Sequence, residues 1–237
     1  MLRILSLLLI STFVFASSPI EKEGLSGHFD LGLNYTQNID KTLQFNNVFL
    51  ANYKHKKSAI SLNNNISFIS KTGQEEVLNK GVQDLKYSLN TKRLAADLTL
   101  QHLYDISRSI QKRWTTGIGL SFAVVKSDIE TVRFGISTLR ERETPIIGEQ
   151  VMKTRMSGNI DFSIKLLENV ELISKNHYQP NIEDVGDFRW KTNFSVRLTL
   201  NSHFLFSFNN TFNYDSIPEI DIPEIDYQLI NSISYSF

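Results

Sequence analysis

Charged side chains recur at every second position in several segments of this sequence, and this spacing is the first clue to its chemistry. Lys153 and Arg155 share one parity, as do Arg189 and Lys191 further along the chain. In an extended strand, residues two apart point to the same face of the sheet. Each series therefore predicts a charged face, which could either line a path for solutes or form ion pairs between neighbouring strands.

One strand register extends this pattern over most of the chain. It assigns apolar residues to one face and places the charged candidates on the other, namely Asp30, Asp84, Lys86, Asp97, Arg133, Lys153, Arg155, Asp161, Glu171, Lys175, Arg189, Lys191 and Arg197. The basic residues are concentrated between 153 and 197, so a pore with this lining would favour small anionic solutes. A ladder of cross-strand ion pairs would instead fill a narrow lumen. The sequence leaves both interpretations open.

A hydrolytic site is a third interpretation, and it depends on His177. Ser174 and Asn176 lie close to it in sequence, but both have the opposite parity, so a triad within this strand is sterically unfavourable. There is no Gly-x-Ser-x-Gly motif, and no set of His, Asp and Glu has the spacing of metal ligands. We therefore predict a protein that is not an enzyme and has no cofactor.

A period of two in hydrophobicity, which is typical of strands, runs through nearly the whole chain. Between 188 and 198, for example, Phe188, Trp190 and Phe194 alternate with Arg189 and Lys191. Twelve such segments are expected, at 28–35, 43–53, 60–68, 81–89, 94–104, 114–122, 132–136, 152–164, 170–178, 188–198, 204–214 and 228–237.

These segments predict an all-β protein, a closed antiparallel transmembrane β-barrel of twelve strands. An apolar face of this kind contacts either lipid or the core of a soluble β-sandwich. Aromatic residues near strand ends, and strands close to the length of a tilted bilayer crossing, favour lipid. No stretch after the first segment is apolar for 18 residues, so a membrane crossing there would require a closed barrel.

The expected connections alternate between two kinds. Short and partly basic turns are expected at 54–57, 90–93, 165–169 and 199–202, and longer loops at 71–77, 139–149, 180–187 and 215–225. Outer-membrane barrels have short periplasmic turns and longer external loops. The pattern therefore predicts that both chain ends lie on the periplasmic side.

The first residues predict export. Arg3 precedes an apolar run from 4 to 15, and Ala16 supplies a small residue at the expected cleavage site. We expect a cleaved signal peptide at 1–16 and the barrel at 17–237. The alternative is an uncleaved anchor helix, but the run is shorter than the roughly 20 residues such a helix needs.

The last segment predicts the membrane into which the protein is inserted. Tyr235 and Phe237 share its apolar face and make an aromatic carboxyl terminus. With the export signal, they indicate a terminal insertion signal that the barrel-insertion machinery reads, and hence the bacterial outer membrane. Membrane lipid and lipopolysaccharide are then expected partners. The net charge is +0, which gives no electrostatic reason to expect nucleic acid.

The first and last predicted hairpins resemble those of a known family. Gly-His-Phe-Asp-Leu-Gly at 27–32 is followed by Thr-Gln-Asn-Ile-Asp at 36–40, and the last hairpin carries Tyr-Asp-Ser at 214–216 and ends at 232–237. These features resemble the YdiY-like, salt-induced outer-membrane proteins, but Gln37 stands where that family usually has Gly. The resemblance implies a structural or stress-related outer-membrane barrel of uncharacterised function, and it supplies no catalytic residues.

Overall fold

Twelve β-strands make up almost all of the described protein. The computed structural model describes residues 23–37, 41–71 and 78–236, so the predicted signal peptide at 1–16 and the terminal Phe237 lie outside the described residues. The strands are β1 (Gly24–Gln37), β2 (Lys41–His55), β3 (Ser58–Lys71), β4 (Leu78–Asn90), β5 (Leu94–Asp105), β6 (Ile110–Lys126), β7 (Glu130–Pro145), β8 (Val151–Leu167), β9 (Val170–Pro180), β10 (Phe188–Thr199), β11 (Phe204–Asp215) and β12 (Ile225–Ser236).

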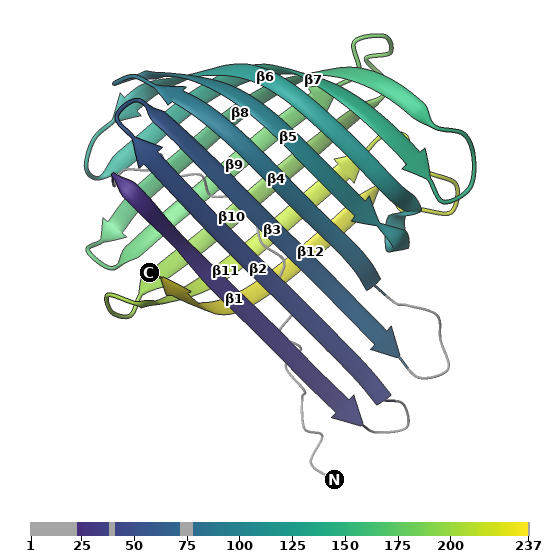
Figure 1. Ribbon diagram of the computed structural model, residues 1–237, viewed down its shortest axis with the longest axis horizontal. Coiled ribbons are helices and arrows are strands. Elements are labelled where there is room, and N and C mark those ends of the chain that lie inside the picture. Colours follow the sequence, from purple (N-terminus) through teal and green to yellow (C-terminus); the bar gives the residue numbers. More distant parts are fainter. Residues whose placement is uncertain (1–22, 38–40, 72–77, 237) are drawn as a thin grey trace.

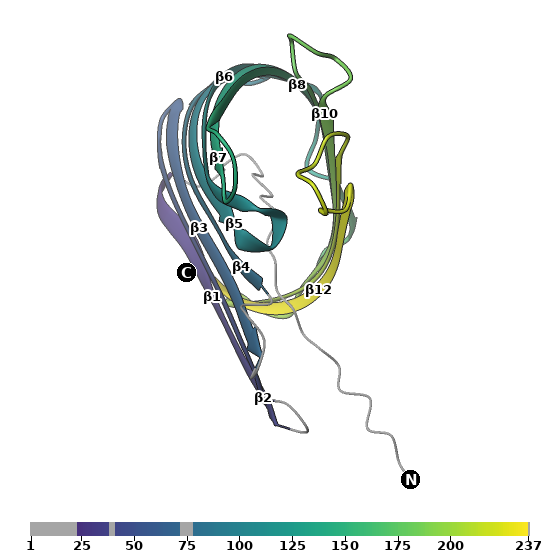
Figure 2. The same ribbon diagram turned by 90° about the vertical axis from the view of Figure 1, so that its right-hand side faces the viewer.

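The strands form one closed antiparallel barrel in which each strand pairs with its neighbours in sequence. The prediction of a twelve-stranded barrel is confirmed. β1 meets β12 at the pairs His28–Ser236 and Phe29–Tyr235, which closes the cylinder. The strands lean together across the wall (Figure 1), and the end-on view shows an oval ring (Figure 2).

The two faces of the barrel wall differ in polarity, and this difference explains why the chain closes. Inward-facing positions are buried and mostly polar, as at Asn63, Ser121 and Ser207. Large apolar residues on the same strands are exposed, and Ile118 on β6 is 66% exposed. A soluble sandwich would bury its apolar face, so the sandwich alternative is wrong. Closure also leaves the backbone of a sheet without free edges.

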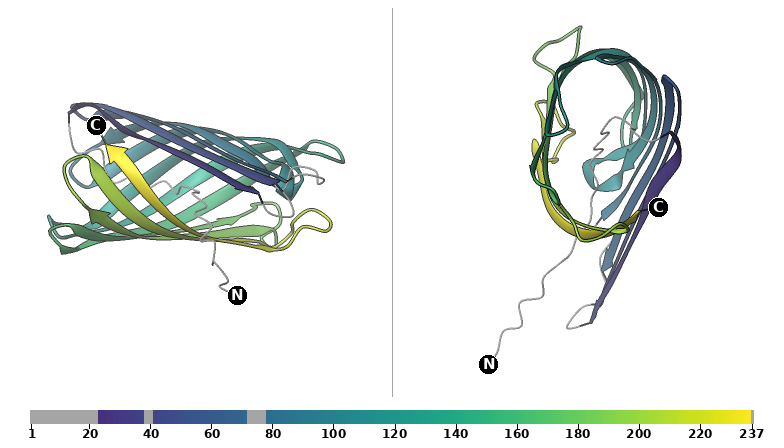
Figure 3. Two further views of the ribbon diagram at one scale, coloured as in Figure 1. Left: turned by 90° about the horizontal axis from the view of Figure 1, so that it is seen from below. Right: turned by 90° about the vertical axis from the view of Figure 1, so that its left-hand side faces the viewer.

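The connections distinguish the two ends of the barrel. β8 and β9 are joined at 168–169 and β4 and β5 at 91–93, whereas β9 to β10 and β11 to β12 are joined by 181–187 and 216–224. We call these the turn end and the loop end. They lie at opposite ends of the leaning strands in Figure 3. A short 3-10 turn, η1 (Ile106–Arg108), joins β5 to β6 at the loop end. No helix in the described ranges is long and apolar enough to cross a membrane.

The predicted loop at 139–149 is wrong, because β7 continues to Pro145. The apolar alternation stops near Leu139, but the alternation of faces does not. Glu141 faces inward and is buried, whereas its neighbours Arg140 and Arg142 are exposed. β8 pairs with β7 along this stretch, for example at Glu141–Lys153. The extension brings acidic side chains into the lumen at the loop end.

Candidate functional site: a charged cluster and a hollow in the lumen

A dense group of charges lies inside the barrel at the loop end. It is built from the first residues of β6, β8 and β10, the last residues of β7 and β11, and the loop before β10. We call it the loop-end cluster, and its members are Arg113, Glu141, Glu143, Lys153, Arg155, Asp187, Arg189 and Asp215. Four of these side chains are cationic and four are acidic, so the cluster is neutral.

Arg155 lies at the centre of the cluster and is 0% exposed. Its Nε donates to Glu141 Oε2 at 3.1 Å, and its Nη2 donates to Asp187 Oδ1 at 2.6 Å. Its Nη1 donates to the carbonyl oxygens of Gln179 and Asp187 at 3.1 and 2.9 Å. A buried guanidinium is tolerated when its donors are satisfied in this way. Arg155 thereby fixes the β9–β10 loop against β7 and β8.

Arg189 carries the cluster across the lumen. Its backbone lies in β10, and its Nη1 donates to Glu141 Oε2 on β7 at 2.9 Å, although two strands of the wall lie between β7 and β10. Its Nε donates to Asp215 Oδ2 on β11 at 3.0 Å. Contacts between strands that are not neighbours cannot run along the wall. They must pass through the interior of the barrel.

The remaining members complete the network at its two sides. Arg113 on β6 pairs with Glu143 on β7. The Oε2 atom of Glu143 also lies 3.5 Å from Arg189 Nη2. Lys153 Nζ lies 2.8 Å from Asp187 Oδ2. Burial raises the pKa of Asp187, but hydrogen bonds and positive charge from Lys153 and Arg155 outweigh that effect, so its pKa lies below the ordinary value. Asp187 is therefore held as a carboxylate.

Sequence reasoning identified three members of this cluster and missed the others. Lys153, Arg155 and Arg189 were predicted to share a face, and the structure brings them together. The members that were missed are Arg113, Glu141, Glu143, Asp187 and Asp215. A signal for two of them was present, since residues 140–143 read Arg-Glu-Arg-Glu and keep a period of two.

The other predicted lumen residues lie in the middle and at the turn end. Lys86 on β4 pairs with Asp97 on β5 at 3.0 Å, and Arg197 on β10 lies 3.8 Å from Glu171 on β9. These are rungs between neighbouring strands. Among the rest, Arg133 donates to Ser121, Gln101 donates to Asp84, Asp161 stands opposite Lys175, and Lys191 stands opposite His177. The side chains of Asp30 and Tyr235 lie outside the described part, as does Phe237.

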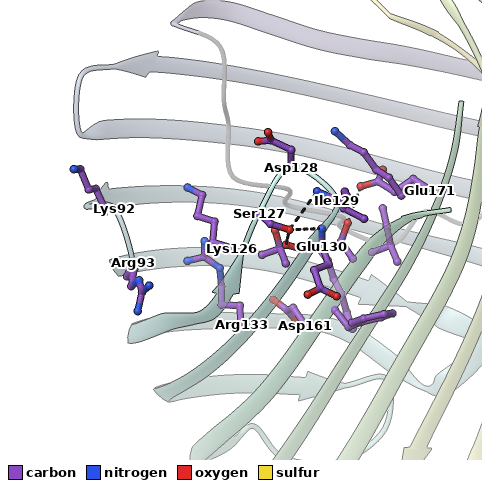
Figure 4. Close-up of a pocket in the computed structure, with 16 residues that line it drawn as sticks. Lys92, Arg93, Lys126, Ser127, Asp128, Ile129, Glu130, Arg133, Asp161 and Glu171 are labelled. Atoms are coloured by element: carbon purple, nitrogen blue, oxygen red, sulfur yellow. Dashed lines mark hydrogen bonds between the residues drawn. The ribbon is translucent and has the colours of Figure 1, made fainter. Parts of the chain in front are cut away.

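A hollow of about 720 Å³ opens in the lumen at the turn end. Figure 4 shows Lys92, Arg93 and Lys126 around it, with Arg133 and Asp161 deeper on the strands. Six cationic and four acidic side chains line it, namely Lys92, Arg93, Lys126, Arg133, Lys165 and Lys175 against Asp128, Glu130, Asp161 and Glu171. The hollow therefore has a small excess of positive charge and could accept a small anion.

The geometry around His177 does not assemble a hydrolytic triad on β9. Asn176 donates to Ser174 Oγ at 3.2 Å, and these two side chains have the opposite parity from the buried Ile173 and Lys175, which face the lumen with His177. Within the described ranges, no group of three or more His, Asp or Glu side chains could hold a metal ion. The charged cluster and the hollow are therefore the candidate site.

Residues 29–237 match the model of a family described as a protein of unknown function, DUF481. Among curated proteins, none matches this sequence.

Several solved structures resemble the barrel at low identity. The NanC porin is 8% identical over 90% of this chain and 97% of its own, with a TM-score of 0.49. The KdgM porin is 9% identical over 90% and 99%, with a TM-score of 0.49. The translocator domain of the autotransporter NalP from Neisseria meningitidis is 10% identical over 92% and 90%, with a TM-score of 0.46.

Proposed function

This chain belongs to the DUF481 family of proteins of unknown function, and we propose that it is a structural or stress-related outer-membrane barrel whose lumen is closed at the loop end. One observation carries the proposal. Arg155 and Arg189 tie β7, β8, β10 and β11 together through Glu141, Asp187 and Asp215 inside the barrel. Side chains that meet there occupy the space through which a solute would have to pass.

The membrane location is supported by the outer face of the wall. Exposed apolar side chains recur on successive strands, for example Leu98 on β5, Ile118 on β6 and Ile136 on β7. Water does not stabilise so much contiguous apolar surface on a monomer, whereas lipid does. A polar interior inside an apolar wall is the arrangement expected of a transmembrane barrel.

The remaining parts of the proposal come from the sequence. The signal peptide at 1–16 would direct export, and Tyr235 with Phe237 would be read by the barrel-insertion machinery. Lipid and lipopolysaccharide would surround the wall. The residues at 27–32 and 36–40 support a place among the YdiY-like, salt-induced proteins within the family. No step of this function requires a catalytic residue or a cofactor.

Conductance in a planar bilayer tests whether the lumen is closed. We expect the wild-type protein, purified from membranes and folded, to insert without unitary current steps. The variant Glu141→Gln, Arg155→Gln, Arg189→Gln removes the contacts between strands that are not neighbours, and we expect it to conduct. Altered migration on heating before electrophoresis confirms that each protein is folded.

A matched control removes an ion pair from the wall instead. Lys86→Gln with Asp97→Asn deletes a rung between the neighbouring strands β4 and β5, and we expect it to stay silent. Stable current steps from the wild-type protein would contradict the closed lumen.

A second candidate is a small-solute channel that prefers anions, and the cationic excess of the turn-end hollow favours it. In that case the wild-type protein conducts, and under a salt gradient the current shows anion preference. Neutralising Lys92, Arg93 and Lys126, which line the hollow, should then abolish the preference. A wild-type protein that is folded and silent argues against this candidate.

A further inference from the structure

Three cations lie on the outside of the barrel wall near the loop end. Lys112 lies on β6, and Arg140 and Arg142 lie on β7; all three are exposed. Arg140 and Arg142 alternate with Glu141 and Glu143, which point into the lumen and belong to the loop-end cluster. We call the three residues the outer cationic patch. Their position on the apolar face is unusual, because charge on a lipid-facing surface is destabilising away from the interface.

The patch lies at the polar border of the apolar wall. Trp114 pairs with Arg142 across β6 and β7, and its ring lies 4.6 Å from that of His102 on β5. Further along the same strands, the outward residues become apolar, at Ile118 and Ile136. Aromatic side chains with one polar edge mark the interface of a bilayer. In the proposed membrane location, the cations would therefore lie at the depth of lipid headgroups.

The cations have no acidic partner among the described residues. The ion pairs of the loop-end cluster involve neither Lys112 nor Arg142, and Arg140 donates instead to the hydroxyl of Thr154 on β8. Glu141 and Glu143 flank Arg142 in the sequence, but their side chains point into the lumen. They are already paired there with Arg155, Arg189 and Arg113. The outer cationic patch thus has positive charge available for an external anion.

A small surface hollow lies between two members of the patch and could hold a ligand. It has a volume of about 150 Å³ and is lined by Lys112, Trp114, Arg142, Thr144 and Gln150. The hollow supplies two cations, a hydroxyl and an amide. Arg140 follows about 7 Å further along β7, since residues two apart in a strand are separated by about that distance. Guanidinium groups bind phosphate oxygens in a bidentate manner.

We propose that the outer cationic patch binds the phosphate groups of lipopolysaccharide in the outer leaflet. The proposal rests on the proposed membrane location, which puts the loop end at the cell exterior. Lys112 and Arg142 hold one phosphate group in the hollow, with Thr144 and Gln150 as further donors. Arg140 neutralises a second phosphate group or the other side of the same one. The apolar wall below them contacts the acyl chains of the same lipid.

Lipid titration of the full chain, followed by native mass spectrometry from detergent micelles, tests the proposal. The probes are bisphosphorylated lipid A, the same lipid without phosphates, and phosphatidylglycerol. We expect wild-type protein to bind bisphosphorylated lipid A at least tenfold more tightly than the variant Lys112→Gln, Arg140→Gln, Arg142→Gln. Removal of the phosphates should cause a similar loss.

The matched control is Lys54→Gln, Lys56→Gln, Lys57→Gln, which removes three cations around the β2–β3 turn at the turn end, away from the hollow, and we expect it to bind like wild type. Equal binding by wild type and the patch variant would overturn the proposal, and so would phosphatidylglycerol binding as tightly as lipid A. Heat-modifiable migration shows that each variant is folded. Failure to insert into lipid vesicles would instead reject the proposed membrane location, so the two failures can be told apart.

Discussion

Arg155 shows what burial in a barrel lumen requires of a charged side chain. It has no exposed surface, yet four hydrogen bonds to Glu141, Gln179 and Asp187 satisfy its guanidinium. Such a group adds little to the free energy of unfolding as long as all its partners are present, because the cost of its desolvation offsets its electrostatic attraction to the carboxylates. Removal of one partner leaves the remaining buried charges with less compensation. The stability of the loop end is therefore sensitive to single substitutions.

Arg155→Met should lower the free energy of unfolding by about 3–5 kcal/mol, because it leaves Glu141 and Asp187 without their shared cation. Urea unfolding in lipid vesicles measures this change. Lys86→Gln is the control, since the side chains of Lys86 and Asp97 keep 32% and 18% exposure whereas Arg155 has none, so a smaller loss is expected. Equal losses for the two variants would contradict the central role of Arg155.

The lowered pKa of Asp187 predicts how the free energy of unfolding changes with pH. Its pKa is lowered from the ordinary 3.8 by Lys153 and Arg155, so its contribution to stability is fully present above that value. The contribution is lost as the pH falls through the lower folded-state pKa. Wild-type protein should thus lose stability between pH 5 and the acid limit more steeply than Asp187→Asn. Parallel profiles for the two proteins would show that Asp187 contributes nothing to this loss.

At the scale of elements, the faces of the strands could be predicted, but the partners across the lumen could not. Apolar alternation in segments such as 188–198 gave the number of strands and the side on which Arg189 lies. The contact between Arg189 and Glu141 spans 48 residues and three strand positions. It depends on the curvature of the closed wall, which no local pattern contains. The end of β7 was missed because its outward positions carry arginine instead of apolar residues.

The apolar face of β5 gives a test of lipid contact. Leu98 is 55% exposed, so Leu98→Arg would be nearly neutral in water. In a bilayer it should be destabilising by about 2–4 kcal/mol if it lies near the midplane. Ile147→Arg is the control, because Ile147 lies in the β7–β8 loop and is 83% exposed. Unfolding in vesicles should separate the two variants, and a neutral Leu98→Arg would argue against lipid at this face.

At the scale of the whole molecule, the two ends differ in both shape and content. The loop end contains the neutral cluster, and the turn end contains the hollow with its cationic excess. The molecule is therefore directional, and a solute at the turn end meets a cavity while a solute at the loop end meets packed ion pairs. This polarity makes the orientation in the membrane a testable property.

The absence of cysteine from the chain makes the orientation measurable with single cysteines. Ile147→Cys, in a loop, should react with a membrane-impermeant maleimide on intact cells. Ser127→Cys, in the β6–β7 turn, should react only after the outer membrane is permeabilised. The reverse labelling pattern would mean that the loop end faces the periplasm.

The charge balance of the loop-end cluster also determines how the barrel responds to an electric field. Moving one elementary charge through 100 mV changes the energy by about 2.3 kcal/mol. Four cations and four carboxylates held together carry no net charge, so their displacement as a body supplies no gating charge. A voltage across the membrane therefore finds almost no net charge in this cluster on which to act. Opening of the loop-end cluster would have to be chemical, through protonation of carboxylates or competition from ions, instead of electrical.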